Sequence, residues 1–163
     1  MIVVADTTPL NYLILVDSVQ VLPDLFEQVR APSAVIAELS HNRAPEAVRL
    51  WAASPPVWLT IQDPTTTDAS LKLGSGETAA IALGRELKAD WILIDERKGT
   101  REAQGRGLRA AGTLAIVEEA GARGLLDYGR TLDRLVRETT FHVTNQVPRD
   151  SEQRFRDRQK ELA

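Results

Sequence analysis

The chain has 163 residues, of which 43% are hydrophobic and 26% charged, a size and balance typical of one domain with one sizeable core. It contains no cysteine, which excludes disulfides, thiolate zinc sites and cysteine nucleophiles, so any metal site must rest on carboxylates. The formal net charge of -3 excludes a globally cationic coat for nucleic acids. No apolar run approaches the ~20 residues of a membrane span, and the N-terminus lacks a signal-peptide pattern. We therefore expect a cytoplasmic protein that does not contact a membrane.

The first part of the chain is predicted to alternate between short strands and helices. The apolar, β-branched run at 2–5 predicts a strand buried on both faces, as in parallel sheets, and this run ends at Asp6. Thr7 and Thr8 are suitable caps for a helix whose first turn contains Pro9. The next elements are predicted in order as a helix at 19–26, a strand at 28–31, a helix at 34–39 capped by Ser33, a helix at 46–53 and an edge strand at 57–61.

The second part continues the alternation after a loop at 62–68. The pattern predicts a helix at 77–88, a strand at 91–94 that ends at Asp95, a helix at 97–106, a strand at 108–111, a helix at 113–122 and a solvated helix at 149–162. Such an order is typical of an α/β fold in which helices cover a mainly parallel sheet. Because no repeat or long linker divides the chain, we expect a single domain over residues 1–163.

Carboxylates follow two of the buried strands. Asp6 and Asp95 come directly after their strands, and in open α/β sheets the ligand site lies beyond the carboxyl ends of the strands. Glu77 opens a helix after a glycine-rich turn, and Glu38 lies in a helix that runs toward the same edge. Four such acids repel one another unless a cation is present, and oxygen ligands alone suit Mg²⁺ or Mn²⁺. Each acid also has a structural interpretation, as a helix cap, a partner of a helix dipole or a surface charge.

Four short motifs resemble the PIN-domain family in their order and approximate spacing. They are VVADTTPL at 3–10, PSAVIAEL at 32–39, GETAAIAL at 76–83 and ILID at 92–95. The resemblance continues through GTL at 112–114, covers roughly 1–125 and leaves about 126–163 as a C-terminal helical extension. It is closest to a VapC-like, mostly uncharacterised prokaryotic branch. The resemblance implies a three-layer α/β/α sandwich with a central, mainly parallel sheet, and metal-dependent cleavage of RNA.

The resemblance also assigns roles to individual residues. Three acids match the family's acidic core by position: Asp6, Glu38 and Asp95. Glu77 occupies a place where many members have Asp, and its arm is one methylene longer. A further family acid has no clear match, because Glu96 is adjacent to Asp95 and Glu102 lies a helical turn or two away. Either Thr7 or Thr8 resembles the hydroxyl residue that orients the first Asp, and we expect Thr113 to approach the same rim.

Together these positions imply a Mg²⁺- or Mn²⁺-dependent endoribonuclease. Asp6, Glu38, Glu77 and Asp95 are expected to be both the metal ligands and the catalytic acids. Basic side chains in the helix after Asp95 are placed to meet RNA phosphates, and they are Arg97, Lys98 and Arg101. The same side chains also suit an ordinary solvated face. Family resemblance further implies a homodimer and, in many members, a toxin that pairs with an antitoxin protein.

Two other functions fit the same residues. The first is a non-catalytic module with a PIN-like scaffold that binds RNA or a protein. The second is a phosphatase of the haloacid-dehalogenase type, since an apolar strand followed by Asp6 is similar to the opening of that superfamily. The acid usually expected two residues after the nucleophile is Thr8 in this chain, which weakens the second alternative.

Overall fold

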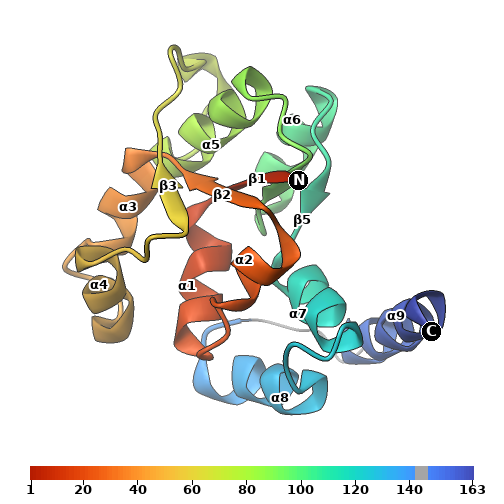
Figure 1. Ribbon diagram of the computed structural model, residues 1–163. Coiled ribbons are helices and arrows are strands. Elements are labelled where there is room, and N and C mark those ends of the chain that lie inside the picture. Colours follow the sequence, from red (N-terminus) through yellow and green to blue (C-terminus); the bar gives the residue numbers. More distant parts are fainter. Residues whose placement is uncertain (142–146) are drawn as a thin grey trace.

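A computed structural model describes residues 1–141 and 147–163, and within them a five-stranded sheet forms the centre (Figure 1). The strands are β1 (Ile2–Ala5), β2 (Gln28–Ala31), β3 (Leu59–Ile61), β4 (Trp91–Leu93) and β5 (Ala110–Ala111). Their order across the sheet is β3-β2-β1-β4-β5, and each neighbouring pair is parallel. All five carboxyl ends therefore lie along one edge, with β1 at the centre.

Helices cover both faces of this sheet, which confirms the predicted three-layer α/β/α architecture. The helices are α1 (Thr7–Leu15), α2 (Val21–Leu25), α3 (Ser33–Leu39), α4 (Glu46–Ala53), the short 3₁₀ helix η1 (Ala69–Leu71), α5 (Ser75–Glu86), α6 (Arg97–Gly105), α7 (Thr113–Ala122), α8 (Tyr128–Glu138) and α9 (Val147–Leu162). Side chains alternate along β1, so Val3 packs into the core under α1, α2 and α7, whereas Val4 packs under α5 and α6.

Several element boundaries differ from the sequence prediction, and for β3 and β5 the reason is a local hydrogen bond that competes with the sheet. The N–H of Leu59 donates to the carbonyl of Pro56 at 3.0 Å, so the chain turns there and β3 begins only at Leu59. The N–H of Leu108 donates to the carbonyl of Ala103 at 3.1 Å, which closes the end of α6 and shortens β5. α5 begins at Ser75, two residues before the predicted start.

The predicted caps of α1 are wrong. Asp6 occupies the N-cap position, and Thr7 is already the first helical residue. The hydroxyl of Thr7 is used by a distant carboxylate instead, as described below for the site.

Helices α7, α8 and α9 form a layer below the sheet (Figure 1). Glu118 of α7 is fully buried, and its carboxylate pairs with Arg154 of α9 at 2.8 Å. The rings of Tyr128 and Phe155 stack with centroids 4.2 Å apart. These contacts attach α9 to α7 and α8. Among the residues that the structure describes, no helix is long and apolar enough to cross a membrane.

Candidate functional site

Asp6 lies at the carboxyl end of the central strand. Its backbone N–H donates to the carbonyl of Leu93 at 2.9 Å, which continues the pairing of β1 with β4. The residue is only 2% exposed, and its Oδ1 atom has no hydrogen-bond partner. Burial raises the pKa of Asp6 to about 7, against a hydrogen bond from the backbone N–H of Thr7 that lowers it, and nearby negative charges raise it further. A buried carboxylate without a partner is costly, so this atom is suited to a bound cation.

Asp95 follows the adjacent strand β4 and is held in a fixed orientation. Its carboxylate accepts hydrogen bonds from the backbone N–H of Thr113 at 2.7 Å and from the Thr113 hydroxyl at 2.6 Å. Burial raises the pKa of Asp95, and the two hydrogen bonds from Thr113 lower it. A Cβ atom at Gly112 would stand 2.7 Å from the Oδ1 of Asp95, so glycine is required for this approach. Thr113 therefore reaches the rim of the site, and its partner is Asp95.

Glu38 connects three helices at the same edge. It lies near the end of α3, and its Oε1 accepts the backbone N–H of Gly76 at 2.8 Å and the Ser75 hydroxyl at 3.2 Å. Its other oxygen accepts the hydroxyl of Thr7. A Cβ atom at Gly76 would stand 2.6 Å from this second oxygen. Of the two threonines that the resemblance offers for orienting the first Asp, Thr7 donates its hydroxyl to Glu38 instead. The backbone N–H of Thr7 donates to Asp6.

Glu77 occupies the first turn of α5 and faces the start of α6. Burial raises its pKa, the carboxyl group of Glu96 raises it further, and a hydrogen bond from the backbone N–H of Gly74 lowers it. A Cβ atom at Gly99 would stand 3.1 Å from the Oε1 of Glu77, so the Glu77 carboxylate lies against the first turn of α6. Glu96 was not among the predicted site residues. Its position directly after Asp95 in the sequence was the signal that could have included it.

The structure brings all four predicted acids to one edge of the sheet. After burial, the negative charges of Glu77, Glu38 and Asp95 also raise the pKa of Asp6, because all three acids lie on this side of the sheet. Over residues 1–141 and 147–163, however, no three acidic or imidazole side chains are close enough together to form a complete metal site. The donor set is all oxygen and includes the unpartnered Oδ1 of Asp6, so its chemistry fits Mg²⁺ or Mn²⁺.

The predicted substrate-binding residues lie beside this edge. The Nζ atom of Lys98 donates to the carbonyl of Lys72 at 2.9 Å, so Lys98 folds back toward the loop before α5. Arg97 and Arg101 are exposed on α6, and neither forms an ion pair within the described part of the chain. Thr8 lies half-buried in the first turn of α1.

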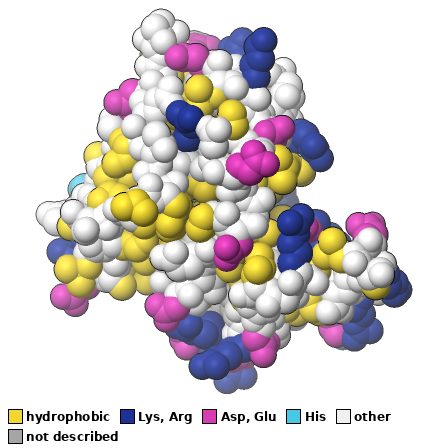
Figure 2. Space-filling model, viewed as in Figure 1, with side chains coloured by type: hydrophobic (Ala, Val, Ile, Leu, Met, Phe, Trp, Pro, Cys, Tyr) yellow, Lys and Arg dark blue, Asp and Glu magenta, His cyan; other side chains and the backbone are white. Residues whose placement is uncertain are grey.

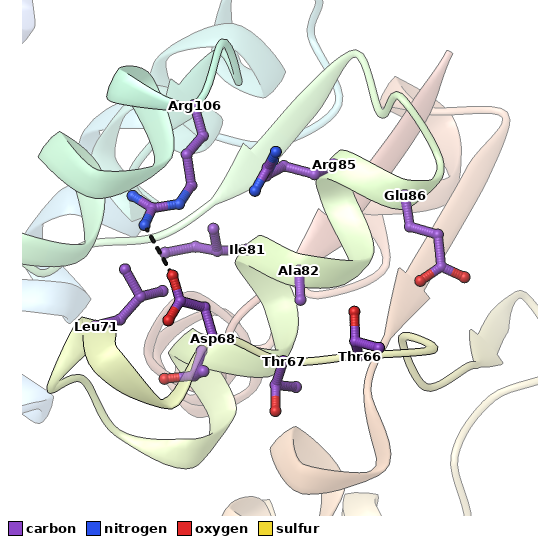
Figure 3. Close-up of a pocket in the computed structure, with 10 residues that line it drawn as sticks. Thr66, Thr67, Asp68, Leu71, Ile81, Ala82, Arg85, Glu86 and Arg106 are labelled. Carbon is purple, nitrogen blue, oxygen red and sulfur yellow. Dashed lines mark hydrogen bonds and ion pairs between the residues drawn. The ribbon is translucent and has the colours of Figure 1, made fainter.

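A cavity of about 400 Å³ lies on another face of α5, and the four acids do not line it (Figure 3). The loop before η1 and the side chains of Ile81 and Arg85 form much of its wall. Arg106 reaches Asp68 at 3.4 Å (Figure 3). It also pairs with Glu102 at 2.5 Å, so its charge is balanced by neighbours. This cavity is therefore separate from the acidic edge.

A parallel sheet between helices, with carboxylates gathered beyond its central strands, is a nuclease-type arrangement. The chain belongs to the PIN-domain family, because a family model described as DUF3368, PIN domain, matches residues 2–156. This assignment confirms the resemblance in the sequence motifs and favours it over the haloacid-dehalogenase alternative.

Among solved structures, the chain is similar to a PilT N-terminus domain protein, SSO1118, from the hyperthermophilic archaeon Sulfolobus solfataricus P2. The identity is 12% and the TM-score 0.47, over 88% of this chain and 100% of that chain. No curated protein gives a sequence match.

Proposed function

We propose that this protein is a Mg²⁺- or Mn²⁺-dependent ribonuclease that hydrolyses phosphodiester bonds of RNA at the acidic edge of the sheet. The observation that carries the proposal is Asp6, which is buried, lacks a partner for Oδ1 and lies within the field of three other carboxylates. A buried carboxylate with an unpartnered oxygen destabilises the fold, which favours a role that needs its charge. Membership of the PIN family supports the same reaction.

Each acid has a distinct part in this proposal. Asp6 supplies the unpartnered oxygen, and the two hydrogen bonds from Thr113 fix Asp95 as a second ligand. Glu38, whose carboxylate is held by the backbone N–H of Gly76, would add negative charge around the cation. Glu77, next to Glu96, would accept a proton from the attacking water. A divalent cation bound there supplies an acidified water and neutralises charge on the phosphoryl oxygens.

The substrate and partners follow from the same proposal. Arg97, Lys98 and Arg101 would hold RNA phosphates along α6, at the rim of the acidic edge. We extend the proposal to a cytoplasmic homodimer that acts as the toxin of a toxin–antitoxin pair, on the strength of the motif resemblance. Growth arrest on induction, relieved by Asp6→Asn, is the expected result in cells.

The decisive experiment incubates the purified protein with labelled structured and unstructured RNAs in Mg²⁺, Mn²⁺ or EDTA. We expect cleavage only with a divalent ion, and products with a 5′-phosphate and a 3′-hydroxyl. Asp6→Asn and Asp95→Asn should reduce the rate at least a hundredfold, because the amide keeps the shape and removes the charge. Asp24→Asn, an exposed Asp on α2, is the matched control and should retain full activity. Absence of cleavage with either ion would refute the proposal.

One observation favours a second candidate, a non-catalytic PIN-like module that binds RNA or a protein. Both oxygens of Glu38 are engaged by hydrogen bonds, and among the described residues no three acids close around one point. Under this alternative, the protein would retain RNA in a filter-binding assay without cutting it, and Asp6→Asn would leave the affinity unchanged. Charge reversal at Arg97 would weaken binding in either case.

A further inference from the structure

A second cavity, of about 450 Å³, lies at the opposite edge of the sheet from the acids. Its wall includes Met1, which precedes β1, Trp91, which begins β4, and Arg109, which precedes β5. Asp6 and Asp95 follow the other ends of β1 and β4, so in a parallel sheet this cavity and the acidic edge are separated by the strands. The volume falls in the range of pockets that hold one small molecule.

The cavity combines an apolar floor with a basic rim. The floor is formed by apolar residues from the end of α2, from strands β4 and β5 and from α7, among them Leu25, Phe26, Trp91, Ala111 and Ile116. Arg109, Arg123 and Arg158 stand around it with a single acid, Glu119. On the right of Figure 2, basic and hydrophobic side chains lie next to one another between the sheet and α9. This combination suits a ligand with an apolar body and a negative charge.

The charges of the rim do not balance. Glu119 accepts the Nε of Arg123 at 2.7 Å and an Nη of Arg158 at 2.8 Å, so two arginines share one carboxylate. Arg158 also lies 3.7 Å from the buried Glu118, but that acid is already paired with Arg154. The other cavity shows the opposite arrangement, since Arg106 there is matched by two acids. The rim around Glu119 therefore keeps guanidinium donors available for an anion.

Arg109 provides a flat surface in the same place. Its guanidinium carbon lies 4.1 Å from the centroid of the Trp91 ring, so the two groups form a cation–π pair. Arg109 is exposed and forms no ion pair within the described residues. A guanidinium plane held on an aromatic ring can stack a nucleobase on its open face.

We propose that this cavity is a nucleotide site, in which Arg109 stacks the base and Arg123 and Arg158 bind the phosphate. Fork-shaped guanidinium groups suit the oxygens of a phosphate, and the apolar floor excludes water from the sugar and base. The site is distinct from the acidic edge and requires neither a divalent ion nor nuclease activity. The nucleotide could be free in solution or could be one unit of an RNA strand, and both have the same chemistry.

The test uses the full chain in EDTA, with Trp91 as the reporter. In a Trp51→Phe/Trp58→Phe variant, Trp91 is the remaining tryptophan of the three in the sequence. We expect adenosine and uridine monophosphates to quench its emission saturably, at least tenfold more tightly than inorganic phosphate. Isothermal titration calorimetry on the unmodified protein gives a second measurement if that variant folds poorly. A decauridylate that binds more tightly than the monophosphate identifies RNA as the source, and equal affinities identify a free nucleotide.

Matched variants locate the binding. Arg109→Gln and Arg123→Gln should each weaken the monophosphate at least tenfold, whereas Arg130→Gln, at an exposed arginine of α8, should leave the affinity unchanged. Asp6→Asn, which alters only the acidic edge, should also leave it unchanged. No saturable signal up to millimolar nucleotide, or a loss in Asp6→Asn without a loss in Arg123→Gln, would overturn the proposal.

Discussion

Replacing Asp6 by Asn should stabilise the fold of the metal-free protein. The pKa of Asp6 is about 7 in the folded state, against its ordinary value of 3.8, chiefly because the side chain is buried. The folded state therefore binds more protons than the unfolded state between about pH 4 and pH 7. Between these two pH values the free energy of unfolding falls as pH rises. Above about pH 7 the fold has lost all of the stability that depends on a protonated Asp6.

The size of the effect follows from the difference between the two pKa values. A difference of about three pKa units corresponds to ~4 kcal/mol of destabilisation near neutral pH, at 1.36 kcal/mol per unit. Asn keeps the carbonyl that accepts the backbone N–H of Thr7, and its amide would face carboxylates that accept hydrogen bonds. Allowing for imperfect fit of the amide, we expect Asp6→Asn to be ~2–4 kcal/mol more stable than the parent at about pH 8.

Urea denaturation in EDTA at about pH 5 and about pH 8 measures this difference. The stability advantage of Asp6→Asn over the parent should be ~2–3 kcal/mol smaller at pH 5 than at pH 8, because at pH 5 the Asp6 carboxyl group is mostly protonated in the folded parent. Asp24→Asn provides the matched control and should change stability little at either pH. In the presence of millimolar Mn²⁺ the order should reverse, since only the parent gains stability from the bound ion. This prediction is wrong if the variant is less stable than the parent at pH 8, or if its gain in stability does not depend on pH.

Two further predictions concern groups that orient the acids. Gly76→Ala should lower the free energy of unfolding by ~1–3 kcal/mol in urea denaturation, because the new Cβ atom would stand 2.6 Å from the Glu38 carboxylate. In the control variant Gly105→Ala the new Cβ atom has no neighbour within 4 Å, so its stability should be unchanged or slightly higher. Thr113→Val should weaken Mn²⁺ binding several-fold in calorimetry without unfolding the chain, because Asp95 would lose the hydroxyl that fixes it; unchanged affinity would contradict this role.

The strands and two of the acids could be predicted because their signals are local. A buried parallel strand appears in the sequence as a short apolar run, and the residue directly after the strand lies at the carboxyl edge of the sheet. This reasoning placed Asp6 and Asp95 beyond β1 and β4, where the structure has them. Glu38 and Glu77 required the family resemblance, since a Glu within a helix has no signature that separates it from a surface charge.

The contacts that orient the acids could not be predicted because they join distant segments. Thr7 and Glu38 are 31 positions apart, and Thr113 and Asp95 are 18 apart. Locally, a threonine at a helix start is best explained as a cap, and only the packing of α3 against α1 and α5 brings the Glu38 carboxylate to the Thr7 hydroxyl. A tertiary contact therefore overrides a local preference that was physically reasonable.

The side chain of Glu77 extends from α5 toward the start of α6. From the first turn of α5, its carboxylate reaches the first turn of α6, where the absent side chain of Gly99 leaves room and Glu96 lies nearby. After burial, the largest contribution that raises the pKa of Glu77 comes from Glu96, which directly follows Asp95 in the sequence. The negative charge of the edge therefore extends from the end of β1 toward α6, the helix whose Arg97 and Arg101 we propose to bind RNA phosphates. Under the proposed function, an RNA strand held along α6 would therefore lie next to the acids.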